Sequence, residues 1–211
     1  MTQASAPSPE IGVIATGIAN IASVLGALRR AGATPRLVER ADEVRDAPLL
    51  VLPGVGSFGA GLQRLDELGI RDAIAARVNA ERPTLAICLG FQLLCARSEE
   101  SPGARGIGVI DAPVERFRTP RRIPQFGWNT VEPDDSCAVL RAGHAYFANS
   151  YRVASAPEGW AEARSVHGEP FIAALERGPV LACQFHPELS GAWGGELFGR
   201  WIARSLEVCP C

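Results

Sequence analysis

Short, mostly apolar segments alternate with segments of helical spacing through the first half of the chain, and this alternation constrains the fold most. Strands that are apolar along their length are typical of a parallel sheet covered by helices on both faces. Asn20 is a natural cap for the first helix, and Gly69 interrupts the second. The spacing predicts strands at 10–15, 35–38, 48–52 and 83–87, and helices at 20–31 and 62–78.

Shorter strands separated by turns follow in the second half, which indicates antiparallel pairing. We expect them at 106–117, 127–132, 145–153, 161–166, 171–176 and 180–185, with a hairpin at 177–179 and a last helix at 194–206. The prediction is one α/β domain over 10–207, with a flavodoxin-like, mostly parallel sheet flanked by helices and antiparallel strands in its second half. Residues 1–9 and 208–211 are expected to form flexible tails.

Charge and composition exclude several classes of function. The 211 residues carry a formal net charge of −2, which gives no electrostatic basis for binding nucleic acid or an anionic membrane. All 21 basic residues are arginine, so a catalytic lysine, a Schiff base and a Walker lysine are excluded.

The termini and the cysteines indicate a reducing compartment. The first residues lack the charged and apolar regions of a signal peptide, and the chain has no run of about 18 apolar residues, so we expect a cytoplasmic protein. The six cysteines form no C-x-x-C pair, and we expect no metal site. Cys209 and Cys211 are interpreted as a pair in the frayed tail.

A cysteine follows the fourth predicted strand and precedes a helical pattern. Ala86-Ile-Cys-Leu-Gly90 has the form of a nucleophile elbow, in which small neighbours allow a sharp strand-to-helix turn. The helix N-terminus would favour a thiolate at Cys88, and the backbone N–H of Leu89 could donate to an oxyanion. The alternative is a buried structural thiol. Cys95, predicted on the same helical face, is interpreted as a core residue.

A histidine and a glutamate, His186 and Glu188, stand two residues apart at the end of another apolar strand. The strand period of two would place both side chains on one side, so that the carboxylate orients the imidazole. His144 and His167 are the rival bases, but neither has a carboxylate at this spacing.

A glycine-rich segment follows the third strand and allows two interpretations. Gly54-x-Gly-x-x-Gly59 matches a dinucleotide fingerprint, but the acidic residue that should end the next strand is absent, because Asp72 lies in a helical pattern. The alternative is an oxyanion hole formed by the backbone N–H groups of Gly54, Val55 and Gly56.

Taken together, these segments resemble the class I glutamine amidotransferases, with a Cys-His-Glu triad. Further segments are similar to those of the glutaminase subunits of imidazole glycerol phosphate synthase. The resemblance covers nearly the whole domain and rests on Pro53-Gly-Val-Gly56, Cys88-Leu-Gly-Phe-Gln92, Gln184-Phe-His-Pro-Glu188, Pro124-Gln-Phe-Gly-Trp-Asn129, Tyr146-Phe-Ala-Asn-Ser-Tyr151, Thr16-Gly-Ile-Ala-Asn20 and Ser98-Glu-Glu100.

The resemblance implies that Cys88 attacks the side-chain amide of glutamine while His186, oriented by Glu188, protonates the leaving ammonia and then activates water. Residues implied to bind the amino-acid end of glutamine are Gln92, Ser150, Tyr151 and, as a weaker candidate, Glu100. The implied partner is a (β/α)8 cyclase subunit in a heterodimer, which uses the ammonia to make imidazole glycerol phosphate in histidine biosynthesis. No cofactor and no metal are implied.

Three positions depart from the family pattern. Ala15 replaces an aspartate, Asn149 replaces a histidine, and Leu189 replaces the basic residue after His-Pro-Glu. By analogy these positions surround the mouth of the site and the subunit interface, so coupling to the partner is where a difference is expected. The open alternatives are a glutaminase for another synthase, a Cys-His peptidase, a dinucleotide-binding module and a silent relative.

Overall fold

The computed structural model describes residues 8–17 and 20–208. Expectations for the first seven residues, for positions 18 and 19, and for Cys209 and Cys211 lie outside the described residues. The strands are β1 (Glu10–Ile14), β2 (Thr34–Val38), β3 (Leu49–Gly54), β4 (Thr84–Cys88), β5 (Cys95–Ser98), β6 (Ile110–Arg116), β7 (Gln125–Pro133), β8 (Gly143–Asn149), β9 (Tyr151–Val153), β10 (Ala161–Val166), β11 (Pro170–Arg177) and β12 (Val180–Cys183). The helices are α1 (Ile21–Arg30), α2 (Ala41–Asp46), α3 (Phe58–Glu67), α4 (Arg71–Asn79), α5 (Leu89–Leu94), the 3-10 helix η1 (Pro187–Leu189) and α6 (Gly191–Val208).

Nine strands form the main sheet, in the order β2-β1-β3-β4-β12-β11-β10-β7-β8. The five strands from β2 to β12 are parallel, and the pairs from β12 to β8 are antiparallel. A second sheet contains β5, β6 and β9. The predicted change from parallel to antiparallel pairing is therefore confirmed, and so is the hairpin between β11 and β12.

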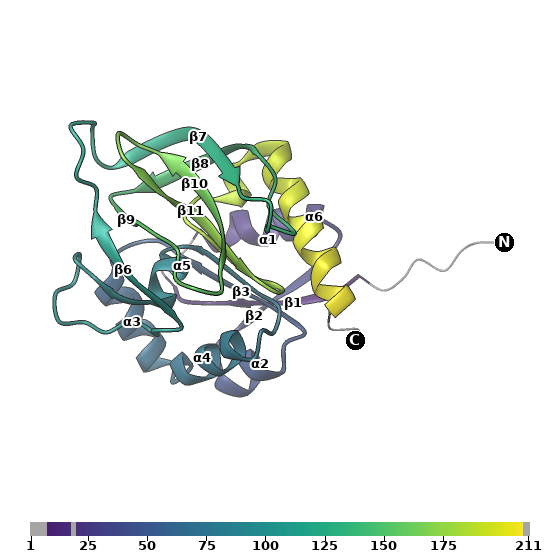
Figure 1. Ribbon diagram of the computed structural model, residues 1–211. Coiled ribbons are helices and arrows are strands. Elements are labelled where there is room, and N and C mark those ends of the chain that lie inside the picture. The colour runs from purple at the N-terminus through teal and green to yellow at the C-terminus, as the bar shows by residue number, and fades with distance from the viewer. Residues whose placement is uncertain (1–7, 18–19, 209–211) are drawn as a thin grey trace.

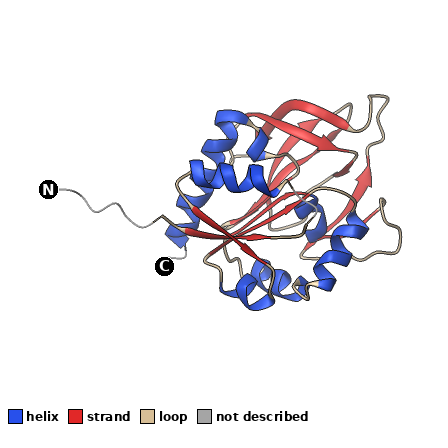
Figure 2. Ribbon diagram, turned by 180° about the vertical axis from the view of Figure 1, so that it is seen from behind, coloured by secondary structure: helices blue, strands red, loops and turns tan. Residues whose placement is uncertain are grey.

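Helices cover the parallel half of the sheet on both faces (Figure 1). Helices α1 and α6 pack on one face and α2, α3 and α4 on the other, as the view from behind also shows (Figure 2). Strand β3 is buried along its whole length, because it has a hydrophobic layer on each side. One layer contains Val24, Leu28, Leu197 and Trp201, and the other contains Val44, Leu62, Ile74 and Leu93.

The single strand predicted at 145–153 is wrong, since the chain changes sheets inside it. Strand β8 lies at the edge of the main sheet, β9 pairs with β6 in the small sheet, and Ser150 joins them. The side chain of Asn149 donates to the carbonyl of Tyr151 at 3.0 Å. Such a local bond from a side chain to the backbone competes with the regular ladder and accompanies the break.

Several predicted boundaries also differ from the structure. The short helix α2 was not predicted, and α3 begins at Phe58, so Gly59, the last glycine of the glycine-rich segment, is helical. Asn20 precedes α1 without a side-chain capping hydrogen bond. Cys95 is buried as predicted, but it begins β5 because α5 ends at Leu94. Across residues 8–17 and 20–208, no helix has the length and hydropathy that crossing a bilayer requires.

Candidate active site

Cys88 lies at the sharp turn from β4 into α5, with φ of 53° and ψ of −107°. A positive φ is rare for a residue other than glycine and costs about 1–3 kcal/mol, so the surrounding structure holds this conformation. Gly90 allows α5 to approach β3, because a Cβ atom there would lie 2.0 Å from the carbonyl oxygen of Leu52. The turn therefore has the strained backbone expected of a nucleophile elbow.

His186 is held directly after β12 by backbone and side-chain contacts. Its N–H donates to the carbonyl of Tyr146 on β8 at 2.9 Å, and its own carbonyl accepts from the hydroxyl of Ser190 at 2.6 Å. The imidazole Nδ1 lies 2.8 Å from Oε1 of Glu188. The expected contact is thus present, but the strand argument for it was wrong, because β12 ends at Cys183 and Glu188 lies in the 3-10 helix η1.

Two acidic groups determine the proton affinity of His186. Burial alone lowers the pKa of the imidazole, but hydrogen bonds to Cys88 and Glu188, together with their charges, raise it to about 10. The ring is therefore protonated at neutral pH, which is the state that can donate a proton to a leaving amine.

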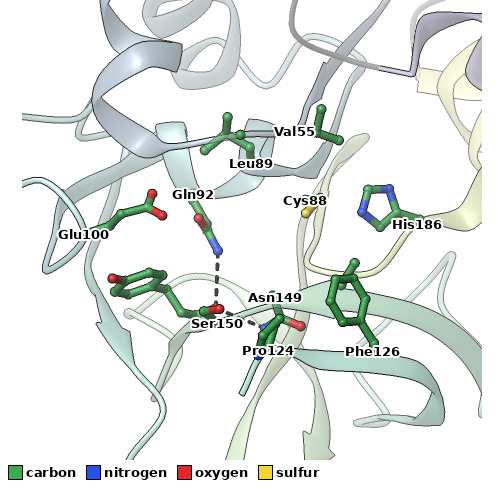
Figure 3. A pocket seen from close by; sticks show the side chains of 13 residues that line it. Val55, Cys88, Leu89, Gln92, Glu100, Pro124, Phe126, Asn149, Ser150 and His186 are labelled. Atoms are coloured by element: carbon green, nitrogen blue, oxygen red, sulfur yellow. Dashed lines mark hydrogen bonds between the residues drawn. The ribbon is translucent and has the colours of Figure 1, made fainter. Parts of the chain in front are cut away.

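A cavity of about 270 Å³ opens beside Cys88. Figure 3 shows the thiol between Gln92 and His186, with Val55 and Leu89 across the cavity from Asn149 and Pro124. The predicted residues that line this cavity are Val55, Gly56, Cys88, Leu89, Gln92, Glu100, Ser150, Tyr151 and His186. Residues far apart in the sequence are thus gathered around one thiol.

The predicted oxyanion residues divide into two groups. Val55, Gly56 and Leu89 line the cavity, whereas Gly54 ends β3 opposite Cys88 in the parallel register of β3 and β4. The chain at Gly56 has φ of 101°, a conformation that favours glycine.

Each predicted substrate-binding residue has contacts within the protein. The amide nitrogen of Gln92 donates to the carbonyl of Tyr151 at 3.3 Å and to the side chain of Gln184 at 2.9 Å. A carboxylate oxygen of Glu100 accepts from the backbone N–H of Phe58 at 2.6 Å, at the start of α3. Glu100 therefore stabilises a helix end while it faces the cavity.

The three departures from the family pattern lie in different environments. Ala15 is buried after β1 and is not among the residues that line the cavity. Asn149 is buried in the cavity wall, further inside than the predicted place at the mouth. Leu189 is exposed in η1, next to Glu188.

The rival bases and the dinucleotide interpretation find no support in the geometry. His144 is exposed on β8, and His167 contacts the carbonyl of Arg122 at 3.0 Å. Asp72 lies in α4, as expected, and not at the end of a strand. Among the described residues, no group of three or more histidine, cysteine or acidic side chains could hold a metal ion.

Sequence reasoning missed several residues of the site. Pro124, Phe126 and Ala148 line the cavity, and all three belong to segments that were quoted for their resemblance without a role for these residues. Gln184 was also quoted without a role, and its amide donates to the sulfur of Cys88 at 3.7 Å. A polar residue at the end of an apolar strand was the available signal.

Comparison with known proteins gives consistent results. The family model described as "Glutamine amidotransferase class-I" matches residues 13–200. The chain is 39% identical over 200 residues to "Imidazole glycerol phosphate synthase subunit HisH" of Deinococcus radiodurans, covering 92% of this chain and 93% of that protein. The protein of the same name in Pyrobaculum aerophilum is 38% identical, with 92% and 97% covered.

A longer relative and a solved structure extend the comparison. "Imidazole glycerol phosphate synthase hisHF, chloroplastic" of Arabidopsis thaliana is 35% identical over 91% of this chain, but the match covers 34% of that protein. A solved structure described as "Crystal structure of glutamine amidotransferase" has a TM-score of 0.75 at 24% identity, with 92% of this chain and 98% of that chain covered. This structural similarity confirms the predicted fold class.

Proposed function

Because this chain belongs to the class I glutamine amidotransferases and, within them, to the glutaminase subunits of imidazole glycerol phosphate synthase, we propose that Cys88, His186 and Glu188 are its catalytic triad. The observation that carries this assignment is the strained turn at Cys88 beside an imidazole whose pKa is raised to about 10. The subunit acts in histidine biosynthesis by releasing ammonia from L-glutamine.

The geometry supports a thioester mechanism. The Cys88 thiolate attacks the amide carbon of glutamine, and the N–H groups of Leu89 and of the loop from Gly54 to Gly56 receive the negative charge on the oxygen. His186 gives its proton to the leaving nitrogen, which departs as ammonia. The neutral imidazole then takes a proton from water, whose hydroxide releases glutamate from the sulfur.

Glutamine would lie along the wall formed by Ser150 and Tyr151. The cavity of about 270 Å³ contains Gln92 and Glu100 on the side away from His186, which suits an α-carboxylate and an α-ammonium group. The carboxylate of Glu100 supplies the negative charge for the ammonium.

An apolar rim around the cavity suits a protein partner. Val55, Phe126, Trp128 and Leu189 are 39%, 70%, 57% and 41% exposed. Val55 and Phe126 line the cavity, Leu189 follows Glu188, and Trp128 packs edge-on against Tyr146, whose backbone pairs with His186. Large exposed apolar side chains around a catalytic mouth indicate a surface that a partner covers.

The cyclase subunit is the partner proposed for this rim. In the Arabidopsis relative, the part similar to this chain belongs to a much longer protein whose name includes both H and F. A partner docked over the mouth of the cavity would receive the ammonia before it could escape into solvent. A cytoplasmic location is part of the proposal, and four free cysteines among the described residues suit a reducing compartment.

Ammonia release from glutamine tests the proposal directly. The chain is assayed alone and with a co-expressed cyclase subunit, and we expect strong stimulation in the complex with the acceptor bound. Cys88→Ala should abolish release in the same complex. Release that persists in Cys88→Ala would contradict the triad, and failure of the two chains to associate at micromolar concentration would contradict the partner.

A further inference from the structure

A fully buried amide, that of Gln184, contacts the nucleophile from the side of β12. Its Nε2 atom lies 3.7 Å from Sγ of Cys88, within hydrogen-bonding range of the large sulfur atom. Gln184 follows the last residue of β12, and its backbone N–H donates to the carbonyl of Ala173 at 2.8 Å. The backbone is therefore fixed close to the strand from which the side chain projects.

A second amide determines which end of the Gln184 side chain faces the sulfur. The Nε2 atom of Gln92 donates to Oε1 of Gln184 at 2.9 Å. Since Gln184 must present its oxygen to this donor, its NH₂ group is directed toward Cys88. Gln92 in turn donates to the carbonyl of Tyr151 at 3.3 Å, and Asn149 donates to the same carbonyl at 3.0 Å.

We propose that Gln184 is a further catalytic residue, which donates a hydrogen bond to the Cys88 thiolate and is held for this role by Gln92. No proton is transferred by the amide, and it stabilises negative charge on sulfur before attack and when the thioester breaks. This inference rests on the proposed function, because it assigns a second donor to the same nucleophile.

The amide of Gln184 joins a set of ionisable groups around the Cys88 sulfur. The groups that face Cys88 are the imidazole of His186, with Glu188 behind it, and the buried thiol of Cys183. Glu100 lies on the opposite side of the cavity. Gln184 supplies a neutral donor, whose contribution persists when His186 loses its proton.

The hydrogen bond from Gln92 to the Tyr151 carbonyl links the Gln184–Cys88 contact to the predicted substrate-binding wall. Gln92 lies in the cavity, where it is proposed to bind the amino-acid end of glutamine, and it bonds both the Tyr151 carbonyl and Gln184. A substrate that repositions Gln92 would therefore change the hydrogen bond that Gln184 donates to Cys88. The effect would pass through the buried amides of Gln92 and Gln184.

The test measures the reactivity of the thiol in the full-length chain, without using glutamine. Iodoacetamide alkylation of Cys88 is followed by peptide mass spectrometry from pH 5 to 10 in the wild type and in Gln184→Met, which keeps the side-chain volume but removes the donor. We expect alkylation at pH 7 to slow roughly 10-fold, with its pH midpoint moved upward by about one unit.

A matched control and a second variant separate this role from a structural one. Gln125 is another buried glutamine, and neither of its amide atoms has a hydrogen-bond partner among the described residues. Gln125→Met should leave the alkylation profile unchanged. If Gln184→Met does not fold, Gln184→Glu keeps the shape and the acceptor for Gln92 but adds a charge, and it should move the midpoint further upward.

An unchanged midpoint in a folded Gln184 variant would overturn the proposal. So would an equal change in Gln125→Met, because the effect would then belong to cavity packing in general. These outcomes are distinct from failure of the proposed function, in which the wild-type complex itself would release no ammonia from glutamine.

Discussion

The imidazole Nδ1 of His186 lies 2.8 Å from Oε1 of Glu188, and the two side chains are only 7% and 3% exposed. A buried carboxylate in this position stabilises the imidazolium and fixes the orientation of the ring. Glu188→Gln should therefore lower the rate of ammonia release from glutamine in the complex by roughly 10³-fold or more, with a small effect on KM. A rate within a few-fold of the wild type would contradict the role of Glu188.

Stability should depend on pH through the same imidazole. The pKa of His186 is about 10 in the folded chain against an ordinary value of 6.5, so the folded state binds more protons between these values. This contribution to the free energy of unfolding is complete below pH 6.5 and is lost as pH rises through 10. Urea unfolding of the wild type and His186→Asn at several pH values measures it. Their difference should shrink across that window, and parallel curves would contradict the assignment.

The close approach of Gly90 to Leu52 predicts that adding one methyl group at position 90 strongly lowers the stability of the fold. In Gly90→Ala the new Cβ would lie 2.0 Å from the Leu52 carbonyl oxygen, which forces α5 away from β3 and costs about 3 kcal/mol of stability or more. Gly199 is the matched control, because it lies inside α6 with nothing within 4 Å of an added Cβ. Gly199→Ala should stabilise the fold by about 0.5–1 kcal/mol. Thermal unfolding distinguishes the two, and equal effects would contradict the packing argument.

The apolar rim predicts where the partner binds. Trp128 is 57% exposed and packs edge-on against Tyr146, whose backbone pairs with His186, so its removal should weaken binding of the proposed cyclase partner by about 2 kcal/mol, roughly 30-fold. Leu37 is 50% exposed on β2, the strand at the opposite end of the main sheet from β8, and Leu37→Ala should leave the affinity unchanged. Calorimetric titration of both variants provides the comparison. Equal affinities for Trp128→Ala and the wild type would exclude this rim as the docking surface.

Segments with strong local patterns were predicted well from the sequence. Strand β10 occupies the predicted residues 161–166, and α3 and α4 are separated at Gly69, where φ is positive. Helix α2 was missed because it has six residues and buries only Val44, which is too short for a periodic pattern.

Features that depend on distant contacts could not be predicted. Whether the chain changes sheets at Ser150 depends on pairing of β9 with β6, about 35 residues earlier, and not on the local sequence. The His186–Glu188 pair was identified from residue types, yet its geometry comes from a 3-10 turn. Gln184 received no role because its partner Gln92 is 92 positions away in the sequence.

The junction at Ser150 has a mechanical consequence. Strand β8 belongs to the main sheet and β9 to the small one, so the cavity wall passes from one sheet to the other at Ser150 and Tyr151. A slight rotation of one sheet against the other would widen or narrow the cavity while leaving the hydrogen-bond ladders of both sheets intact. A protein that binds the outer surface of β7 and β8 would thereby act on the width of the cavity beside Cys88.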